Sequence, residues 1–424
     1  MPAECERRPC QRRRDGLHGI PPEALPSKCL VGSVSLRVIP EVAPVTDDDA
    51  FRHEIRDWLA TNLTDELRGA GGPGRENEAF PQRLAFARRL AGAGWTTLAW
   101  PVAHGGRGAS LQRQVIFHEE YARAGAPSRV DHIGTTMVGP TLIALGTRAQ
   151  RDRFLPAIAA VGQLWCQGYS EPGAGSDLAG VITRARLDGD RWVLTGQKVW
   201  TSLAHVADWC FVLARTEPVP PGGPRHAGLS YLLVPMRQPG VTVRPIRQLT
   251  GDSEFNEVFF DDATTEAGLV VGEPGQGWRV AMATLAFERG AATVGQQVGF
   301  QRDLDDLVAV ARRTGAATDP ALRDRLTRAW IDLSVLRAHT LRSLTEDLPA
   351  GSSVIKLLWT RWRQGLGDLA MDVLSAGDAG PEATERWQRY FLFSRADTIY
   401  GGSNEIQRGI VAERVLGLPR QARG

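Results

Sequence analysis

The stretch "WCQGYSEPGAGSDLAG" (residues 165–180) combines residue types that suit the binding of a polar ligand. Bulky residues typical of a strand lead into a segment rich in Gly, Ser and Pro. Such a loop exposes backbone N–H groups and the hydroxyls of Ser170 and Ser176 at one end of a β domain. These donors suit an anionic or polar flat ligand. The alternative is a plain Gly/Pro turn that binds nothing.

A second stretch, "GQKVWTSLAHVADW" (residues 196–209), places an indole two residues before a hydroxyl. Side chains alternate along a strand, so Trp200 and Ser202 are expected on one face. An indole and a hydroxyl spaced in this way can flank a planar heterocycle and hydrogen-bond to it. The alternative is an ordinary core tryptophan, because the chain has 12 of them.

Two further stretches raise questions, "TLAFERG" (residues 284–290) and "YGGSNEIQ" (residues 400–407). Glu288 follows an otherwise apolar stretch, residues 282–287, where a carboxylate is unusual. The alternative for Glu288 is a surface carboxylate or one paired with Arg289. In the second stretch, two glycines interrupt a helical pattern at a cost of roughly 1 kcal/mol each, so some constraint must require them.

Several other chemistries are excluded by the composition and the motifs. The chain has neither a GxxxxGK[ST] phosphate loop nor an HExxH pair, and its eight histidines show no metal-ligand spacing. Its five cysteines are scattered without a CxxC pair, which argues against a disulfide framework or a zinc site and favours a reducing cytoplasm. A net charge of +2 gives no strong field for nucleic acid or a membrane surface. No apolar run reaches the roughly 18 residues of a membrane span.

The elements that position these residues fall into successive regions of an α+β fold. Residues 1–45 are rich in Pro, Arg and Cys without a period, and we expect a disordered extension or a start codon assigned too early. Residues 46–162 show the apolar period of helices. Residues 163–275 show short strands between Gly, Pro and Asp, including a hairpin through Asp188-Gly189, and predict an antiparallel β domain. Residues 276–424 return to long helical patterns.

Five motifs occur in an order and spacing that resemble the acyl-CoA dehydrogenase family. They are "YSEPGAGSDLAG", "GQKVWTS", "EFNEVFFDDA", "GWRVAMATLAFERG" and "YGGSNEIQRGIVAERVLGLPR". The resemblance covers residues 48–420 and looks like a divergent actinobacterial branch. It implies an N-terminal helical domain, a middle antiparallel β-barrel domain and a C-terminal four-helix bundle.

The resemblance implies FAD as the cofactor. Ser170 would meet the pyrimidine end of the isoalloxazine, Trp200 would pack against the ring, and Ser202 would hydrogen-bond near N5. The full implied set for the cofactor is Gln167, Tyr169, Ser170, Ser176, Trp200, Thr201, Ser202, Ser403, Asn404 and Glu405. The implied substrate contacts are Ser176, Arg289, Tyr400, Gly401 and Gly402.

The reaction implied is α,β-dehydrogenation of an acyl thioester, in which a carboxylate takes the α-proton while hydride leaves the β-carbon for flavin N5. Many relatives carry this carboxylate directly after the Tyr of the last turn, where this chain has Gly401. Other relatives carry it before an Arg on an earlier helix, which the "FERG" segment matches. The resemblance therefore implies Glu288 as the base, while a backbone N–H in the turn polarises the thioester carbonyl.

Two segments that the family uses to hold a neighbouring subunit's FAD are missing. "VAVARRTGAATDPALRDRL" lacks an Arg-x-x-Phe-Gly pattern, and "MDVLSAGDAGPEA" lacks Gln-x-x-Gly-Gly. Homotetramer and heterotetramer therefore both stay open, as does a weakly active or non-catalytic subunit. CoA or carrier-protein thioesters are open as substrates, and a flavin oxygenase or nitroalkane oxidase is a third possibility. By resemblance, an electron-transfer flavoprotein accepts the electrons.

Overall fold

The computed structural model describes residues 47–287, 292–346, 348 and 350–419, so the predicted extension at residues 1–45 lies outside them. The described chain begins with helices, as the apolar period predicts. In the first helix Phe51, Ile55 and Leu59 recur every fourth residue and are buried on one face. The helices of this part are α1 (Asp47–Asn62), α2 (Phe80–Gly92), α3 (Leu111–Arg123), α4 (Gly139–Leu145) and α5 (Arg148–Ala159).

The middle of the chain forms a sheet with the strand order β6-β7-β3-β2-β4-β5-β8, and β1 pairs with β4. The strands are β1 (Trp165–Gly168), β2 (Arg184–Asp188), β3 (Arg191–Ser202), β4 (Trp209–Arg215), β5 (Leu229–Pro235), β6 (Val241–Ile246), β7 (Phe255–Glu266) and β8 (Val270–Val271). Strands β2 and β3 form the predicted hairpin, closed by Gly189 and Asp190. Gly189 has a φ of 60°, which such a turn favours.

Most strand pairs of the sheet are antiparallel, as expected, but the sheet is mixed because two pairs are parallel. Strand β1 runs parallel to β4, with Cys166 opposite Cys210, and β2 touches β4 in parallel at Arg184. A parallel pair needs a long crossover between its strands. Residues 169–208 supply that crossover and contain the β2–β3 hairpin. Local alternation of side chains carries no information about such a distant partner.

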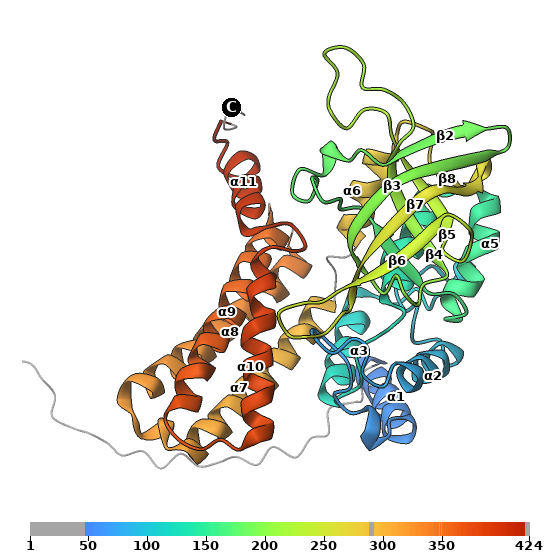
Figure 1. Cartoon of the computed structure of the whole chain (residues 1–424). Coiled ribbons are helices and arrows are strands. Elements are labelled where there is room, and N and C mark those ends of the chain that lie inside the picture. The colour runs from blue at the N-terminus through green and yellow to red at the C-terminus, as the bar shows by residue number, and fades with distance from the viewer. Residues whose placement is uncertain (1–46, 288–291, 347, 349, 420–424) are drawn as a thin grey trace, which may run out of the picture. The chain divides into compact units, whose positions relative to one another are not determined.

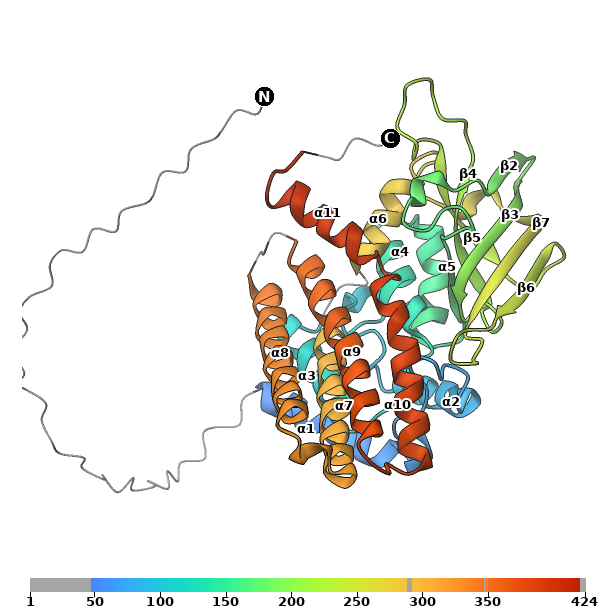
Figure 2. The same ribbon diagram turned by 60° about the vertical axis from the view of Figure 1, so that its left-hand side comes forward.

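The last part of the chain is helical and contains the four-helix bundle implied by the resemblance. Figure 2 shows α7, α8, α9 and α10 side by side. Their buried contacts include Leu307, Leu336, Trp362, Leu366 and Trp387. The helices are α6 (Gly277–Phe287), α7 (Ala292–Thr314), α8 (Pro320–Thr345), α9 (Gly351–Ser375), α10 (Pro381–Ser394) and α11 (Asn404–Arg414).

One apolar core joins the first helices, the sheet and α6. It contains Leu142 of α4, Phe154 of α5, Tyr231 of β5 and Val280 of α6. Figure 1 shows α5 and α6 beside the strands. This shared core places α6 against the sheet that carries the loop after β1. We call this loop, residues 169–180, the glycine-rich loop. Across the described residues, no helix combines the length and apolar character needed to span a membrane.

Candidate active site

A buried ion pair holds the glycine-rich loop against the sheet. Nζ of Lys198 on β3 donates to Oε1 of Glu171 at 2.8 Å, to the carbonyl of Tyr169 at 3.1 Å and to that of Leu213 at 2.7 Å. Both side chains of the pair are almost inaccessible to solvent. The Glu171 carboxylate also accepts the N–H groups of Ile182 and Thr183. Burial raises the pKa of Glu171, but Lys198 and these donors outweigh it and hold the pKa below its ordinary value.

The sequence motifs predicted no role for Lys198 or Glu171, although the rarity of lysine in this chain indicated that Lys198 could have one. Lysine occurs only at positions 28, 198 and 356, whereas the chain has 50 Lys and Arg residues in total. Lys198 and Lys356 are both buried. A compact ammonium can donate to three converging oxygens, for which a planar guanidinium is unsuited. A rare lysine in an arginine-rich chain is therefore informative.

Trp200 lies at an irregularity in β3, and its ring is presented to solvent. The β3–β7 register shifts between Lys198 and Thr201, as in a β-bulge, and Trp200 has a φ of 60°. The Trp200 side chain is 58% exposed, Thr201 is fully buried and Ser202 is half-buried. Trp200 and Ser202 therefore share the outer face. Thr201 turns inward, its hydroxyl has no hydrogen-bond partner among the described residues, and its carbonyl accepts from Nδ2 of Asn256 at 3.1 Å.

The loop meets β3 directly beside Trp200. The carbonyl of Ser170 accepts the N–H of Val199 at 2.9 Å. Gln167 and Ser170 are half-buried, and Ser176 is exposed. The Tyr169 ring instead packs edge-on against Phe211 and Tyr231 in the core. The loop therefore contacts β3 one residue before Trp200, while the Tyr169 ring points into the core. The remaining sites lie on other elements.

The double glycine forms a left-handed turn before the last helix. Gly401 and Gly402 have φ values of 63° and 84°, which L-amino acids with a side chain rarely adopt. A Cβ on Gly402 would also lie 2.4 Å from Nε2 of Gln407, which donates to the carbonyls of both glycines at 3.3 Å. The hydroxyl of Ser403 accepts the N–H of Ile406 and caps α11. These constraints explain why the helical pattern is interrupted here.

The residues that flank this turn are held by α9. The Tyr400 hydroxyl donates to Oδ1 of Asp397 at 2.7 Å, and Oδ1 of Asn404 accepts from the Thr360 hydroxyl at 3.2 Å. Asn404 is buried, whereas Glu405 is exposed. Burial raises the pKa of Asp397, and Arg363 of α9 opposes that shift. The chain is therefore held by α9 on both sides of the turn, at Asp397 before it and at Asn404 after it.

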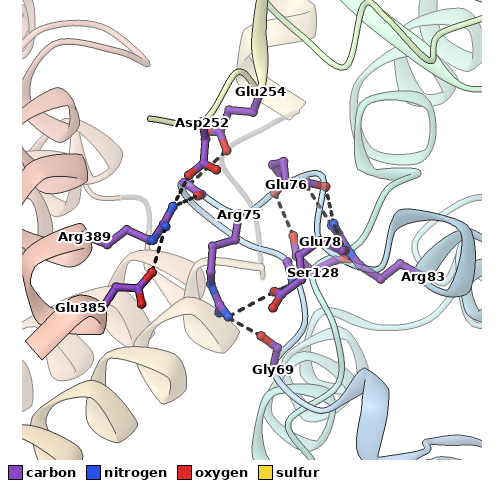
Figure 3. A network of polar contacts seen from close by, with 12 residues as sticks. Gly69, Arg75, Glu76, Glu78, Arg83, Ser128, Asp252, Glu254, Glu385 and Arg389 are labelled. Atoms are coloured by element: carbon purple, nitrogen blue, oxygen red, sulfur yellow. Dashed lines mark hydrogen bonds and ion pairs between the residues drawn. The ribbon is translucent and has the colours of Figure 1, made fainter. Parts of the chain in front are cut away.

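A cluster of carboxylates joins the loop before α2 to the start of β7 and to α10 (Figure 3). Oε2 of the buried Glu254 accepts the N–H of Gly74 at 3.0 Å. Asp252 pairs with Arg389 of α10, which also donates to the Gly74 carbonyl. Burial, then the nearby Glu76 and Asp252, raise the pKa of Glu254 to about 7, although the N–H groups of the loop oppose this.

Glu254 directly precedes Phe255, which links this cluster to the exposed indole. Phe255 is opposite Ser202 in the β3–β7 ladder, and its ring meets that of Trp200 edge-on at 6.2 Å. The sequence motif "EFNEVFFDDA" contains Glu254, but the motif alone did not distinguish it from the other acids there. Its burial depends on contacts with the Gly74 loop, which is far away in the sequence.

Glu288 and Arg289 lie outside the described residues. The helix that precedes them is well anchored, because the Thr284 hydroxyl lies 2.8 Å from that of Thr141 on α4 and donates to the Val280 carbonyl. The proposed base therefore follows a helix whose position is set by the shared core.

Three family models match almost all of the described chain. They are the acyl-CoA dehydrogenase N-terminal domain at residues 46–161, the middle domain at 166–263 and the C-terminal domain at 275–416. The chain belongs to the acyl-CoA dehydrogenase family. This acyl-CoA dehydrogenase has the fold that the motifs implied, and it is an oxidoreductase that dehydrogenates an acyl-CoA between its α and β carbons. Enzymes of the family are FAD-dependent.

Similar proteins agree with this assignment and with an actinobacterial branch. Acyl-CoA dehydrogenase IpdE1 of Mycobacterium tuberculosis (strain ATCC 25618 / H37Rv) is 61% identical to this acyl-CoA dehydrogenase over 386 residues, which cover 89% of this chain and 100% of the relative. The structure of the Tcur3481-Tcur3483 steroid ACAD has a TM-score of 0.76 at 29% identity, covering 89% of this chain and 100% of that chain. The ChsE4-ChsE5 complex from Mycobacterium tuberculosis has a TM-score of 0.74 at 30% identity, covering 90% and 100%.

Proposed function

We propose that this acyl-CoA dehydrogenase holds FAD with the Gln167–Ser176 loop, Trp200 and Ser202. The observation that carries the proposal is the exposed Trp200 ring on a left-handed backbone, beside a half-buried hydroxyl on the same face. A bulky residue in that conformation costs stability, and such strain clusters at functional sites. These residues fit a flat heterocycle. When bound, FAD supplies the acceptor for the hydride from the substrate's β-carbon.

We assign Ser403, Asn404 and Glu405 to the same cofactor, since they begin α11 after the glycine turn. Helix N-termini bind phosphate groups through unpaired N–H donors and the helix dipole. Glu405 is fully exposed, and its pKa lies below its ordinary value because the backbone N–H at the start of α11 and the Ser403 hydroxyl bond to it. A phosphate would compete with this carboxylate for those donors, so the Glu405 side chain would have to turn away before the start of α11 could bind the phosphate.

We propose Glu288 as the base that removes the α-proton, with Arg289, Tyr400, Gly401, Gly402 and Ser176 around the substrate. The support is the position of Glu288 in the family motif, after the apolar end of α6. The N–H of Gly401 would donate to the thioester carbonyl and stabilise the charge that develops on its oxygen. The glycine turn leaves space where a side chain would otherwise project.

The test is anaerobic bleaching of the flavin by straight, branched and ring-bearing acyl-CoAs. We expect the wild type to be reduced and Glu288→Gln to be slowed by about 100- to 10,000-fold, because a general base typically contributes two to four orders of magnitude. Glu382→Gln, in the first turn of α10, is the matched surface control. Reduction of Glu288→Gln at the wild-type rate would sink the base assignment.

We infer that the substrate is a bulky, ring-bearing acyl thioester of CoA. The support is the open Gly401-Gly402 turn and the likeness to a complex described as a steroid ACAD. The bleaching series tests this directly, since straight-chain thioesters would then reduce the flavin more slowly than ring-bearing ones. The same thioester on a carrier protein is the alternative, and it would reduce the flavin when the CoA form does not.

We further propose that the chain works in a heterotetramer with a second chain of the family, in the cytoplasm, and passes electrons to an electron-transfer flavoprotein. The support is the absence of both segments that relatives use on a neighbour's FAD, together with the two-chain composition of the similar complexes. We also keep residues 46–162, 163–275 and 276–424 as the proposed domains. A purified chain that is a fully flavinated homotetramer and turns over substrate would contradict the two-chain assembly.

A further inference from the structure

One polar face of α9 holds both ends of the glycine turn. It consists of Lys356, Thr360, Arg363 and Gln364, which follow one another at helical spacing. Gln364 donates to the Ser394 carbonyl and the Thr398 hydroxyl, both at 3.2 Å. Arg363 donates to Oδ1 of Asp397 at 3.0 Å. With the bond from Thr360 to Asn404, this face fixes the chain before the turn and after it.

Lys356 is the member of this face that lies nearest the turn itself. Its Nζ donates to the Asp397 carbonyl at 2.6 Å and lies 4.5 Å from the ring centroid of Trp359 and 4.6 Å from that of Tyr400. The heavy atom nearest to a Cβ built on Gly401 is this Nζ, at 3.7 Å. The ammonium is therefore beside the Gly401 backbone.

This location costs free energy, since burying an ammonium removes its hydration. The carbonyl and the two aromatic faces return part of that cost. A neutral side chain of similar length would fill the same space with a smaller desolvation free energy. In a site shielded from water, however, a fixed positive charge acts strongly on any charge that develops nearby. The presence of a charged side chain beside the turn therefore indicates an electrostatic role.

We propose that Lys356 is a positioning residue whose ammonium stabilises negative charge on a thioester carbonyl oxygen held at the Gly401 turn. The proposal rests on the proposed function. As the α-proton leaves for Glu288, the electron pair of the C–H bond moves toward the carbonyl, and its oxygen becomes enolate-like. No electron leaves the substrate in this step. The N–H of Gly401 binds that oxygen, and Lys356 supplies the field.

Other charged groups surround the turn and must be held constant in a test. Burial raises the pKa of the Asp397 carboxylate, and the charges of Arg363, Lys356 and Arg395 oppose that shift. Glu254 adds to the upward shift that burial and Asp397 impose on the pKa of Tyr400. A substitution that removes the ammonium also removes its effect on Asp397, so a charge-restoring variant is needed beside it. Lys356→Met retains length and removes charge, and Lys356→Arg restores charge.

The experiment is a spectrophotometric pH titration of acetoacetyl-CoA bound to the full chain. This β-ketoacyl thioester has an acidic α-proton, so the apparent pKa of the bound molecule measures how well the site stabilises an enolate. We expect Lys356→Met to raise that pKa by about one unit or more, a tenfold loss, and Lys356→Arg to restore most of it. Thr360→Val, on the same face, tests a merely structural role.

The outcomes separate the two proposals. If Thr360→Val and Lys356→Met weaken binding equally at every pH while the apparent pKa stays constant, Lys356 only supports the turn and the inference is wrong. If Lys356→Met does not fold, the Lys356→Arg and Lys356→Gln pair decides, because only the second lacks charge. A wild type that binds acetoacetyl-CoA without ionising it overturns the inference. One that binds no CoA thioester at all overturns the proposed function as well.

Discussion

The ammonium of Lys198 and the carboxylate of Glu171 form a buried ion pair that joins β3 to the glycine-rich loop. Each ion alone would be costly in the core, and each makes additional hydrogen bonds to main-chain groups. The pair therefore acts less as a source of net stability than as a device that permits one loop geometry. That geometry sets the position of Ser170 relative to Trp200.

We predict that Lys198→Met destabilises the chain by about 3–5 kcal/mol, because it leaves the Glu171 carboxylate buried without a counter-ion. Urea unfolding measures the loss. The double variant Lys198→Met/Glu171→Gln should recover part of it. Arg186→Met, which breaks the exposed pair with Asp188, is the control and should change stability by less than about 1 kcal/mol. Equal effects of the two single variants would contradict the role of the buried pair.

A second prediction concerns the glycine turn. Gly402→Ala should cost about 1–2 kcal/mol, because an L-residue there must adopt the left-handed conformation and displace Gln407. Gly409→Ala is the matched control within α11, where a Cβ meets nothing within 4 Å. It should stabilise the protein by about 0.5–1 kcal/mol. Thermal unfolding of both variants reports the difference, and a neutral Gly402→Ala would show that the turn tolerates a side chain.

A third prediction concerns Trp200, whose backbone is left-handed. Its replacement should not lower stability but should weaken cofactor binding. Trp200→Gly should leave stability unchanged or raise it by up to about 1 kcal/mol, because glycine adopts a positive φ freely. The affinity for FAD should fall about tenfold or more through loss of ring stacking. Ala79→Gly, at a φ of 45° before α2, is a control that should gain stability without affecting FAD. Equal FAD affinity in Trp200→Gly and wild type would remove Trp200 from the cofactor site.

The fourth prediction is a pH dependence that comes from Glu254. Its pKa is about 7 in the folded chain and near 4.5 when exposed, so the folded state holds the proton more tightly. Stability from this group is complete below about pH 4.5 and is lost as the pH rises through 7. At about 1.4 kcal/mol per pKa unit, the loss is on the order of 3 kcal/mol.

Glu254→Gln should abolish that loss, since an amide cannot ionise. The comparison is the free energy of unfolding of wild type and variant at pH 5 and pH 8, with the difference between them growing at high pH. Glu257→Gln, on β7 three residues after Glu254 and bonded to Gln197, is the control. Parallel curves for wild type and Glu254→Gln would show that Glu254 is not protonated near neutral pH.

Much of the fold followed from local patterns. The apolar spacing of Phe51, Ile55 and Leu59 predicts α1, and the structure confirms it, because the residues that share one face of a helix are near in sequence. The Asp188-Gly189 hairpin was found for the same reason, with its turn one residue later. The parallel pairing of β1 with β4 was not, because it joins segments separated by a crossover.

The sequence by itself determined the family, the order of its three parts and the glycine pair before α11, since each is written in contiguous residues. Only the tertiary structure decided that Lys198 meets Glu171, that Lys356 lies beside Gly401 and that Glu254 is enclosed by the Gly74 loop. These contacts join residues far apart in the chain. The charge, burial and pKa of each group depend on which distant neighbour packing brings to it, and no local pattern records that choice.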